Sequence, residues 1–148
     1  MKNIHYLIMA VCLLFGSCQE KPNKLYEEGI SLELAQLRKK EIKDLKYNLR
    51  FSIPEQKQEA VEGETRILFT IQKPQEIILD FRESADKVKE VSVNGQPSEY
   101  SFLNEHIILP EGSTIEGENE VHIRFTAGNQ SLNRNDEFLY TLLVPDRA

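Results

Sequence analysis

Apolar and polar residues alternate along most of the chain after residue 44, at the period of two that β-strands require. The clearest run is Leu45 to Ile53, which is apolar at every second position and ends before Pro54. The other predicted strands cover residues 61–71, 76–81, 88–93, 98–103, 106–109, 121–125 and 138–144. The pattern therefore predicts an all-β fold of about eight short strands, arranged as an antiparallel sandwich or an open, curved sheet.

Short turn signals separate these strands. Asn94-Gly95 is the strongest hairpin signal, and it predicts that residues 88–93 pair with residues 98–103. Because Gln96-Pro97 follows, we expect a loop longer than two residues. Most aromatic side chains fall on the apolar phase of their strands and are interpreted as core residues.

One short helix is predicted before the strands. Ser31 is a suitable N-cap, and a partial apolar stripe follows it from Leu32 to Leu37. The basic residues 38–40 lie near the expected end of the helix, where positive charge is favourable.

The first residues differ from the rest in character. Lys2 precedes the apolar run Leu7 to Phe15, which is typical of a secretory signal peptide at residues 1–17. Gly16 and Ser17 precede Cys18 as in the lipobox of bacterial lipoproteins, which predicts a lipid on Cys18 and a membrane anchor on the periplasmic or cell-surface side. An ordinary cleaved signal peptide with a chance cysteine is the alternative. Residues 18–30 would then form a tether, and residues 31–148 the folded domain.

Charge and cysteine content argue against a nucleic-acid-binding protein and against a disulfide-linked framework. Removing residues 1–17 takes away Lys2 and no acidic residue, so the net charge of −6 becomes −7. An acidic chain argues against nucleic acid as a partner. Cys12 lies in the predicted signal peptide and leaves Cys18 alone, so no intramolecular disulfide is expected.

Candidate chemistry is sparse. Outside the signal peptide, His106 and His122 have no second ligand at a zinc-binding spacing, so both are interpreted as surface or rim residues. The sequence contains no nucleophile elbow and no phosphate-binding loop. The groups Glu116, Glu118, Glu120 and Asn133, Asn135, Asp136 lack the ligand order of a calcium loop and are interpreted as solvated turns. We therefore expect no catalytic, cofactor-binding or metal-binding residue in this chain.

Several segments, taken in order, resemble the N-terminal domain of M1-family zinc aminopeptidases. They are Glu33 to Lys39, Ile42 to Pro54, Leu79 to Phe81, Val93 to Gly95 and Leu132 to Ala148. The similarity covers about residues 30–148. It implies a saddle-shaped β domain that packs against a thermolysin-like catalytic domain.

This resemblance also limits what the chain can do. In the family, zinc is held by a His-Glu-x-x-His motif and a downstream Glu, and the sequence contains no such motif. The Gln that the family's N-terminal domain often adds to the substrate pocket is not found either, since residues 142–144 stand at that place. We expect no activity from this chain alone, whereas the parent family is a zinc-dependent metallo-exopeptidase.

The last segment of the sequence, Glu137 to Ala148, is the predicted junction to a catalytic domain that is missing or separately encoded. Its apolar density and its resemblance to the family point to the junction residues Tyr140, Val144, Pro145, Asp146 and Arg147. Two alternatives remain. The chain could be a stand-alone surface or periplasmic module that binds peptide or glycan, or an enzyme with an unrecognised site.

Overall fold

The computed structural model describes residues 23–128, 133–134 and 137–140, and gives only the backbone for residues 133–134 and 139–140. Its helices are η1 (Lys24–Tyr26), α2 (Leu32–Glu41), η2 (Ala85–Lys87) and η3 (Glu111–Ser113). Its strands are β1 (Lys43–Ser52), β2 (Glu62–Ile71), β3 (Ile77–Asp80), β4 (Val88–Val93), β5 (Gln96–Pro97), β6 (Ser101–Leu103), β7 (His106–Leu109), β8 (Gly117–Thr126), β9 (Asn133–Arg134) and β10 (Leu139–Tyr140). The prediction of an antiparallel β fold with one short helix before it is confirmed.

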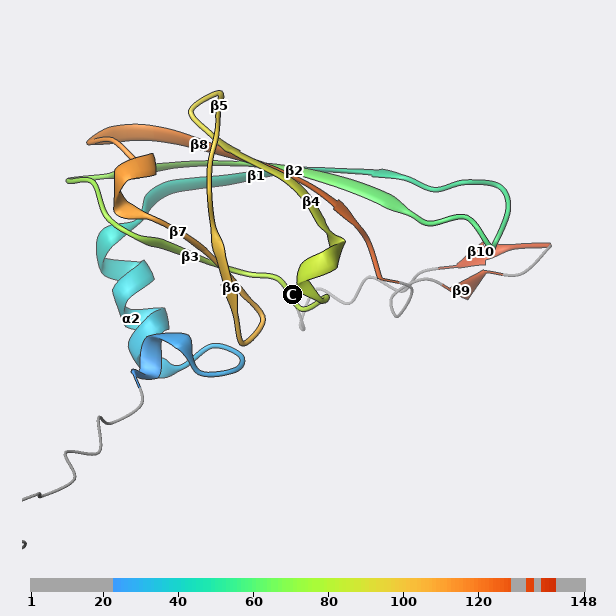
Figure 1. The fold of residues 1–148 in the computed structure, drawn as a ribbon, viewed down its shortest axis with the longest axis horizontal. Coiled ribbons are helices and arrows are strands. Elements are labelled where there is room, and N and C mark those ends of the chain that lie inside the picture. Colours follow the sequence, from blue (N-terminus) through green and yellow to red (C-terminus); the bar gives the residue numbers. More distant parts are fainter. Residues whose placement is uncertain (1–22, 129–132, 135–136, 141–148) are drawn as a thin grey trace, which may run out of the picture.

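These strands form sheets in which every pairing is antiparallel. A five-stranded sheet has the order β1-β2-β8-β4-β5, and a three-stranded sheet has the order β3-β7-β6. The described residues also include the two-stranded pair of β9 and β10. Figure 1 shows the long strands β1, β2, β4 and β8 arching over β3, β6 and β7.

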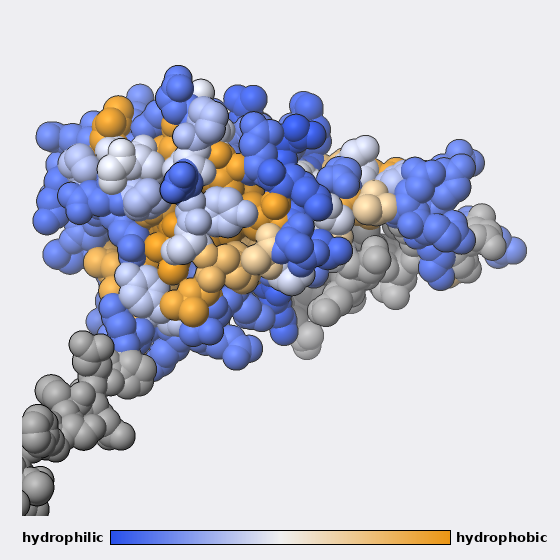
Figure 2. All heavy atoms as spheres, viewed as in Figure 1, coloured by the Kyte–Doolittle hydropathy of each residue, from blue (hydrophilic) through white to orange (hydrophobic). Residues whose placement is uncertain are grey.

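The main core lies between the two larger sheets. The alternation in β2 buries Thr65, Ile67, Phe69 and Ile71 on one face, as the sequence predicted. The three apolar residues of this set share one buried cluster with Ile77, Val88, Val91, Val93, Ile107, Leu109, Val121 and Ile123. In Figure 2 hydrophobic residues gather around the middle of the molecule, with hydrophilic residues toward its periphery.

Helix α2 covers the other face of the three-stranded sheet and makes a third layer. Its buried Leu34 packs with Ile78 of β3 and Ile108 of β7. Strand β7 is therefore buried along its whole length, on both faces. The predicted N-cap is confirmed, because the Oγ of Ser31 accepts a hydrogen bond from the Leu34 amide at 3.1 Å.

The hairpin at Asn94-Gly95 differs from the prediction in two ways. Val93 pairs with Gln96, so the loop has only two residues, and Asn94 and Gly95 both have positive φ values of 51° and 77°. This is the backbone of the tight turn that Asn-Gly favours. The expected partner, residues 98–103, is only partly right: the Ser98 amide donates to the Val91 carbonyl at 3.0 Å, but Ser101–Leu103 leaves this sheet and pairs with β7 in the other.

Replacing Gly95 with alanine is expected to lower the free energy of unfolding by about 1 kcal/mol, because a Cβ disfavours the left-handed backbone of this turn. Gly112 is the matched control, since neither glycine has an atom within 4 Å of an added Cβ and only Gly95 has a positive φ. Urea denaturation of both variants measures the difference. Equal losses in the two variants would contradict a conformational cause.

Candidate functional site

The most distinctive surface of the described residues is an apolar groove between β1 and β3. Strand β1 is an edge strand whose ten residues are all exposed. Its inward positions are nevertheless apolar, since Tyr47 lies opposite Ile67 and Leu49 opposite Thr65 of β2. The three-stranded sheet covers β2 and β8 but leaves these β1 side chains open to solvent. We call this surface, from Leu45 to Phe51 on one side and Leu79 to Phe81 on the other, the β1–β3 groove.

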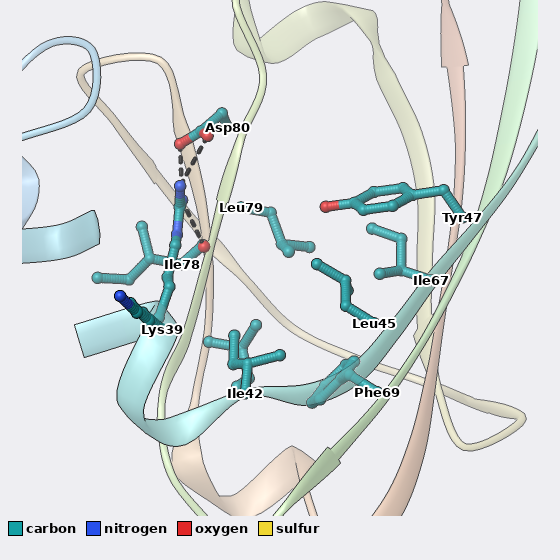
Figure 3. A pocket seen from close by; sticks show the side chains of 11 residues that line it. Lys39, Ile42, Leu45, Tyr47, Ile67, Phe69, Ile78, Leu79 and Asp80 are labelled. Atoms are coloured by element: carbon teal, nitrogen blue, oxygen red, sulfur yellow. Dashed lines mark hydrogen bonds and ion pairs between the residues drawn. The ribbon is translucent and has the colours of Figure 1, made fainter. Parts of the chain in front are cut away.

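Two adjoining hollows make up the groove, with volumes of about 310 and 320 Å³. Tyr47, Ile67, Leu79 and Asp80 line both of them. Figure 3 shows the first hollow, in which Leu45, Tyr47 and Ile67 point across the gap toward Leu79. A hollow of this kind is large enough to receive several side chains of a partner.

A bulge sets the direction of the first β1 side chains. Lys43 pairs with Thr70 and Lys46 pairs with Leu68, so one extra residue is inserted between them. Asp44 absorbs the bulge with a positive φ of 52°. Leu45 consequently joins the inner, apolar face and lines the first hollow.

Aromatic rings close the far end of the groove. Phe51 of β1 and Phe125 of β8 meet edge to face with ring centroids 6.2 Å apart, and Phe125 meets Phe81 at 5.5 Å. Gly63 of β2 lies between Phe51 and Phe125 in the register. A Cβ on Gly63 would come within 2.5 Å of the Phe125 ring, so the glycine permits this packing.

Tyr47 combines exposure with a partly desolvated phenol. Of its surface 62% is exposed, yet its hydroxyl end points into the groove (Figure 3). Burial raises the pKa of the phenol, and the charge of Asp80 adds to the effect while that of Arg38 opposes it. The ring is therefore a neutral, amphipathic contact in the middle of the groove.

An ionic network supports the β3 wall. Arg38 of α2 donates to both carboxylate oxygens of Asp80, at 2.8 and 2.6 Å, and to the Ile78 carbonyl at 2.8 Å. On the same carboxylate, Oδ1 lies 3.1 Å from Nδ1 of His106, a contact that is not aligned as a hydrogen bond. The other ring nitrogen, Nε2, lies 2.9 Å from the Glu27 carbonyl and must carry the hydrogen, because a carbonyl only accepts.

The interpretation of His106 as a surface or rim residue is wrong. Its side chain is 1% exposed, because β7 is covered by the five-stranded sheet on one face and by α2 and η1 on the other. His122 lies on the polar, outer phase of β8 as expected and is half-buried, with Nε2 3.7 Å from Glu64. The described residues contain no cluster of three or more metal-ligating side chains.

The aromatic residues divide into two groups. Phe69 is buried, and Phe81, Phe102 and Phe125 pack against the core, as predicted. The core interpretation fails for the side chains that β1 exposes, Tyr47 and Phe51, and for Tyr100 and Phe138, which are also exposed. Alternation alone predicts which side chains share a face and cannot predict whether that face is covered.

Other predicted site residues lie mostly outside the described part. Cys18, the predicted lipidation site, and the junction residues Val144, Pro145, Asp146 and Arg147 are not among the described residues. The junction residue Tyr140 belongs to β10, where it pairs with Asn133 of β9. Residues 23–30, within the range assigned to a tether, include η1, whose Tyr26 hydroxyl donates to Glu76. None of the described helices is long and apolar enough to cross a membrane.

The sequence pattern missed the groove and the network behind it. Arg38 and Asp80 stand 42 positions apart, and no local spacing indicates that they meet. Both do lie in segments that carry the family resemblance, Glu33 to Lys39 and Leu79 to Phe81. That resemblance was the available signal.

Comparisons with known proteins give a limited result. A scan against protein-family models finds no match, and a search of curated proteins finds no significant match. Among solved structures, the fold is similar to that of a two-domain M1 zinc metallopeptidase, a mutant form bound to L-tryptophan, with a TM-score of 0.43 and 16% sequence identity. The similarity covers 63% of this chain and 23% of that one.

Proposed function

We propose that this chain is the non-catalytic N-terminal domain of a peptidase M1-like aminopeptidase, a scaffold that packs against a zinc metallopeptidase domain. The ordered segments that resemble the family support the parentage. The observation that carries the scaffold role is the β1–β3 groove, an apolar surface that no element of the described residues covers. Apolar patches of this kind usually mark interaction sites.

The proposed scaffold contributes no chemistry of its own. Zinc belongs to the partner domain, whose His-Glu-x-x-His motif this sequence does not contain. We propose that the domain is exported and held at a bacterial membrane by a lipid on Cys18. The nucleotide sequence that follows codon 148, and that of neighbouring genes, tests the parentage: an encoded M1 catalytic domain is expected, and its absence from both would contradict the proposal.

Dye binding tests whether the groove is an exposed docking surface. The purified domain is expected to increase the fluorescence of an apolar dye while it remains folded, and the double variant Tyr47→Thr/Leu49→Thr is expected to lose most of this signal. Threonine keeps the β propensity of the strand while it removes apolar area.

Leu103→Thr/Ile115→Thr is the matched control, because both residues are exposed and lie outside the groove. It should retain the dye signal. Circular dichroism and urea denaturation establish that each variant is folded. A native domain that unfolds cooperatively and binds no dye would contradict the docking role.

A stand-alone surface or periplasmic module that binds peptide or glycan is the second candidate. It is favoured by the open position of Tyr47, whose ring is accessible to a small ligand from the groove. Binding of a defined peptide or glycan by the isolated domain, lost in Tyr47→Thr, would favour this candidate if no catalytic domain is encoded nearby.

A further inference from the structure

The outer face of the five-stranded sheet carries a row of alternating charges that ends at the edge of β1. The register places Arg50 opposite Glu64, Glu64 opposite Arg124, and Arg124 opposite Glu90. Arg50 lies 3.4 Å from Glu64, and Arg124 lies 3.3 Å from Glu90. The row crosses β1, β2, β8 and β4 in order. Each charged side chain lies opposite a side chain of the other sign on the next strand, an arrangement that stabilises the sheet.

Lys46 gives the same edge a second positive charge on the outer face. It stands four residues before Arg50 and lies opposite the uncharged Leu68. Between them Asn48 lies opposite Arg66, whose own ion-pair partner is Glu120 at 3.6 Å. The outer face of β1 therefore presents two positive charges at the edge of the sheet, Lys46 opposite Leu68 and Arg50 paired on its inner side with Glu64, in a chain whose net charge is −6.

The edge of β1 opposite β2 pairs with no strand of residues 23–128, 133–134 or 137–140. An unpaired edge is a template for another strand. The inner positions Leu45, Tyr47 and Leu49 are apolar, and the outer positions Lys46 and Arg50 are basic. The complementary strand is apolar on its inner face and acidic at two outer positions four residues apart.

We propose that β1 pairs with an extended, acidic strand from the partner domain, which continues the five-stranded sheet and lays its apolar side chains over the β1–β3 groove. This proposal rests on the proposed function, since the partner domain supplies the strand. A second copy of this chain fits less well: antiparallel pairing of two β1 strands about Asn48 places Lys46 of each copy opposite Arg50 of the other, and like charges directly opposite are destabilising.

A synthetic nine-residue peptide tests the proposal directly. The probe is Thr-Val-Glu-Val-Thr-Val-Glu-Val-Thr with blocked ends. When it pairs antiparallel with β1 and its central Thr lies opposite Asn48, its two Glu residues lie opposite Arg50 and Lys46. The control peptide has Lys in place of both Glu. We expect the acidic peptide to bind at least about tenfold more tightly, because two attractive pairs replace two repulsive ones.

Charge reversal on the protein should invert this preference. The variant Lys46→Glu/Arg50→Glu is expected to bind the basic peptide more tightly than the acidic one. Lys24→Glu/Lys89→Glu changes the net charge equally at exposed lysines away from β1 and should keep the original preference. A preference for the acidic peptide that survives in the β1 variant would overturn the proposal.

Two measurements separate strand pairing from simple charge attraction. Amide hydrogen exchange of β1 should slow when the acidic peptide binds, and N-methylation of the peptide amides should abolish binding because it removes the backbone donors. Binding without exchange protection, no binding of either peptide, or a dimer of the domain that protects β1 would each overturn the proposal. The first two results leave the proposed function intact if an encoded catalytic domain is found. Strand pairing without such a domain would contradict the proposed function and, with it, the partner domain as the source of the strand.

Discussion

Replacing Leu109 with alanine is expected to lower the free energy of unfolding by about 3 kcal/mol, which is typical of a fully buried leucine. Leu109 is 0% exposed and belongs to the cluster between the two larger sheets. The truncation removes apolar contacts and leaves a cavity, because β7 is held by neighbouring strands on both sides and cannot collapse into the space. Urea denaturation followed by circular dichroism measures the change.

Leu103→Ala is the control for this experiment. Leu103 belongs to β6 of the same sheet but is 47% exposed, so its truncation should cost less than about 1 kcal/mol. Similar losses at the two positions would mean that β7 is not the centre of the core that the structure describes.

The second large effect is expected at Arg38. Arg38→Ala should lower the free energy of unfolding by about 2 kcal/mol, because it removes the three hydrogen bonds that tie α2 to β3 and leaves Asp80 without its main partner. The value is below that of a fully buried ion pair, since the Asp80 side chain is 43% exposed and solvent screens part of the interaction. Denaturation and amide exchange in α2 report the loss.

Two variants show whether geometry or charge is responsible. Arg38→Lys keeps the charge but cannot make the forked contact with both carboxylate oxygens, so it should recover less than half of the loss. Lys40→Ala removes an exposed lysine of the same helix, which among the described residues pairs with Glu41, and should leave the stability almost unchanged. A loss in Lys40→Ala equal to that in Arg38→Ala would contradict a specific role for the bridge.

The groove and the network have a common structural cause. Arg38 fixes α2 against β3, and α2 leads directly into β1. The start of β1 is therefore placed relative to β3 by the contacts of α2, the ion pair of Arg38 and the packing of Leu34 on Ile78, rather than by a covering sheet. This arrangement holds the two walls of the groove while its apolar surface stays open to solvent.

Strand positions were largely predictable because alternation is a local property of the chain. The run from Leu45 to Ile53 and the run from residue 61 to residue 71 both became long strands with the expected faces. The Ser31 cap is equally local, since its hydrogen bond spans three residues. The predicted length of the hairpin loop was wrong, because Gln96 and Pro97, predicted as loop residues, both pair with β4 and extend the sheet.

Burial was not predictable to the same degree, and β1 and β2 show why. Both alternate apolar and polar residues over ten positions, yet β2 has a neighbour on each side and a sheet below it, whereas β1 is an edge strand beyond the reach of that sheet. The same pattern thus describes a core strand and an exposed one. His106 gives the converse case, in which a polar residue is buried because layers cover both faces of β7.

The sequence by itself determined most of the strands and the helix cap, because each depends on residues close together in the chain, and the order of several segments carries the resemblance to one domain of a zinc aminopeptidase. Only the tertiary structure decided that the β1 face is open, that Arg38, Asp80 and His106 meet, and that alternating charges line up from β4 to the edge of β1. Those properties depend on which strands become neighbours, and strand order is set by packing between segments far apart in the sequence.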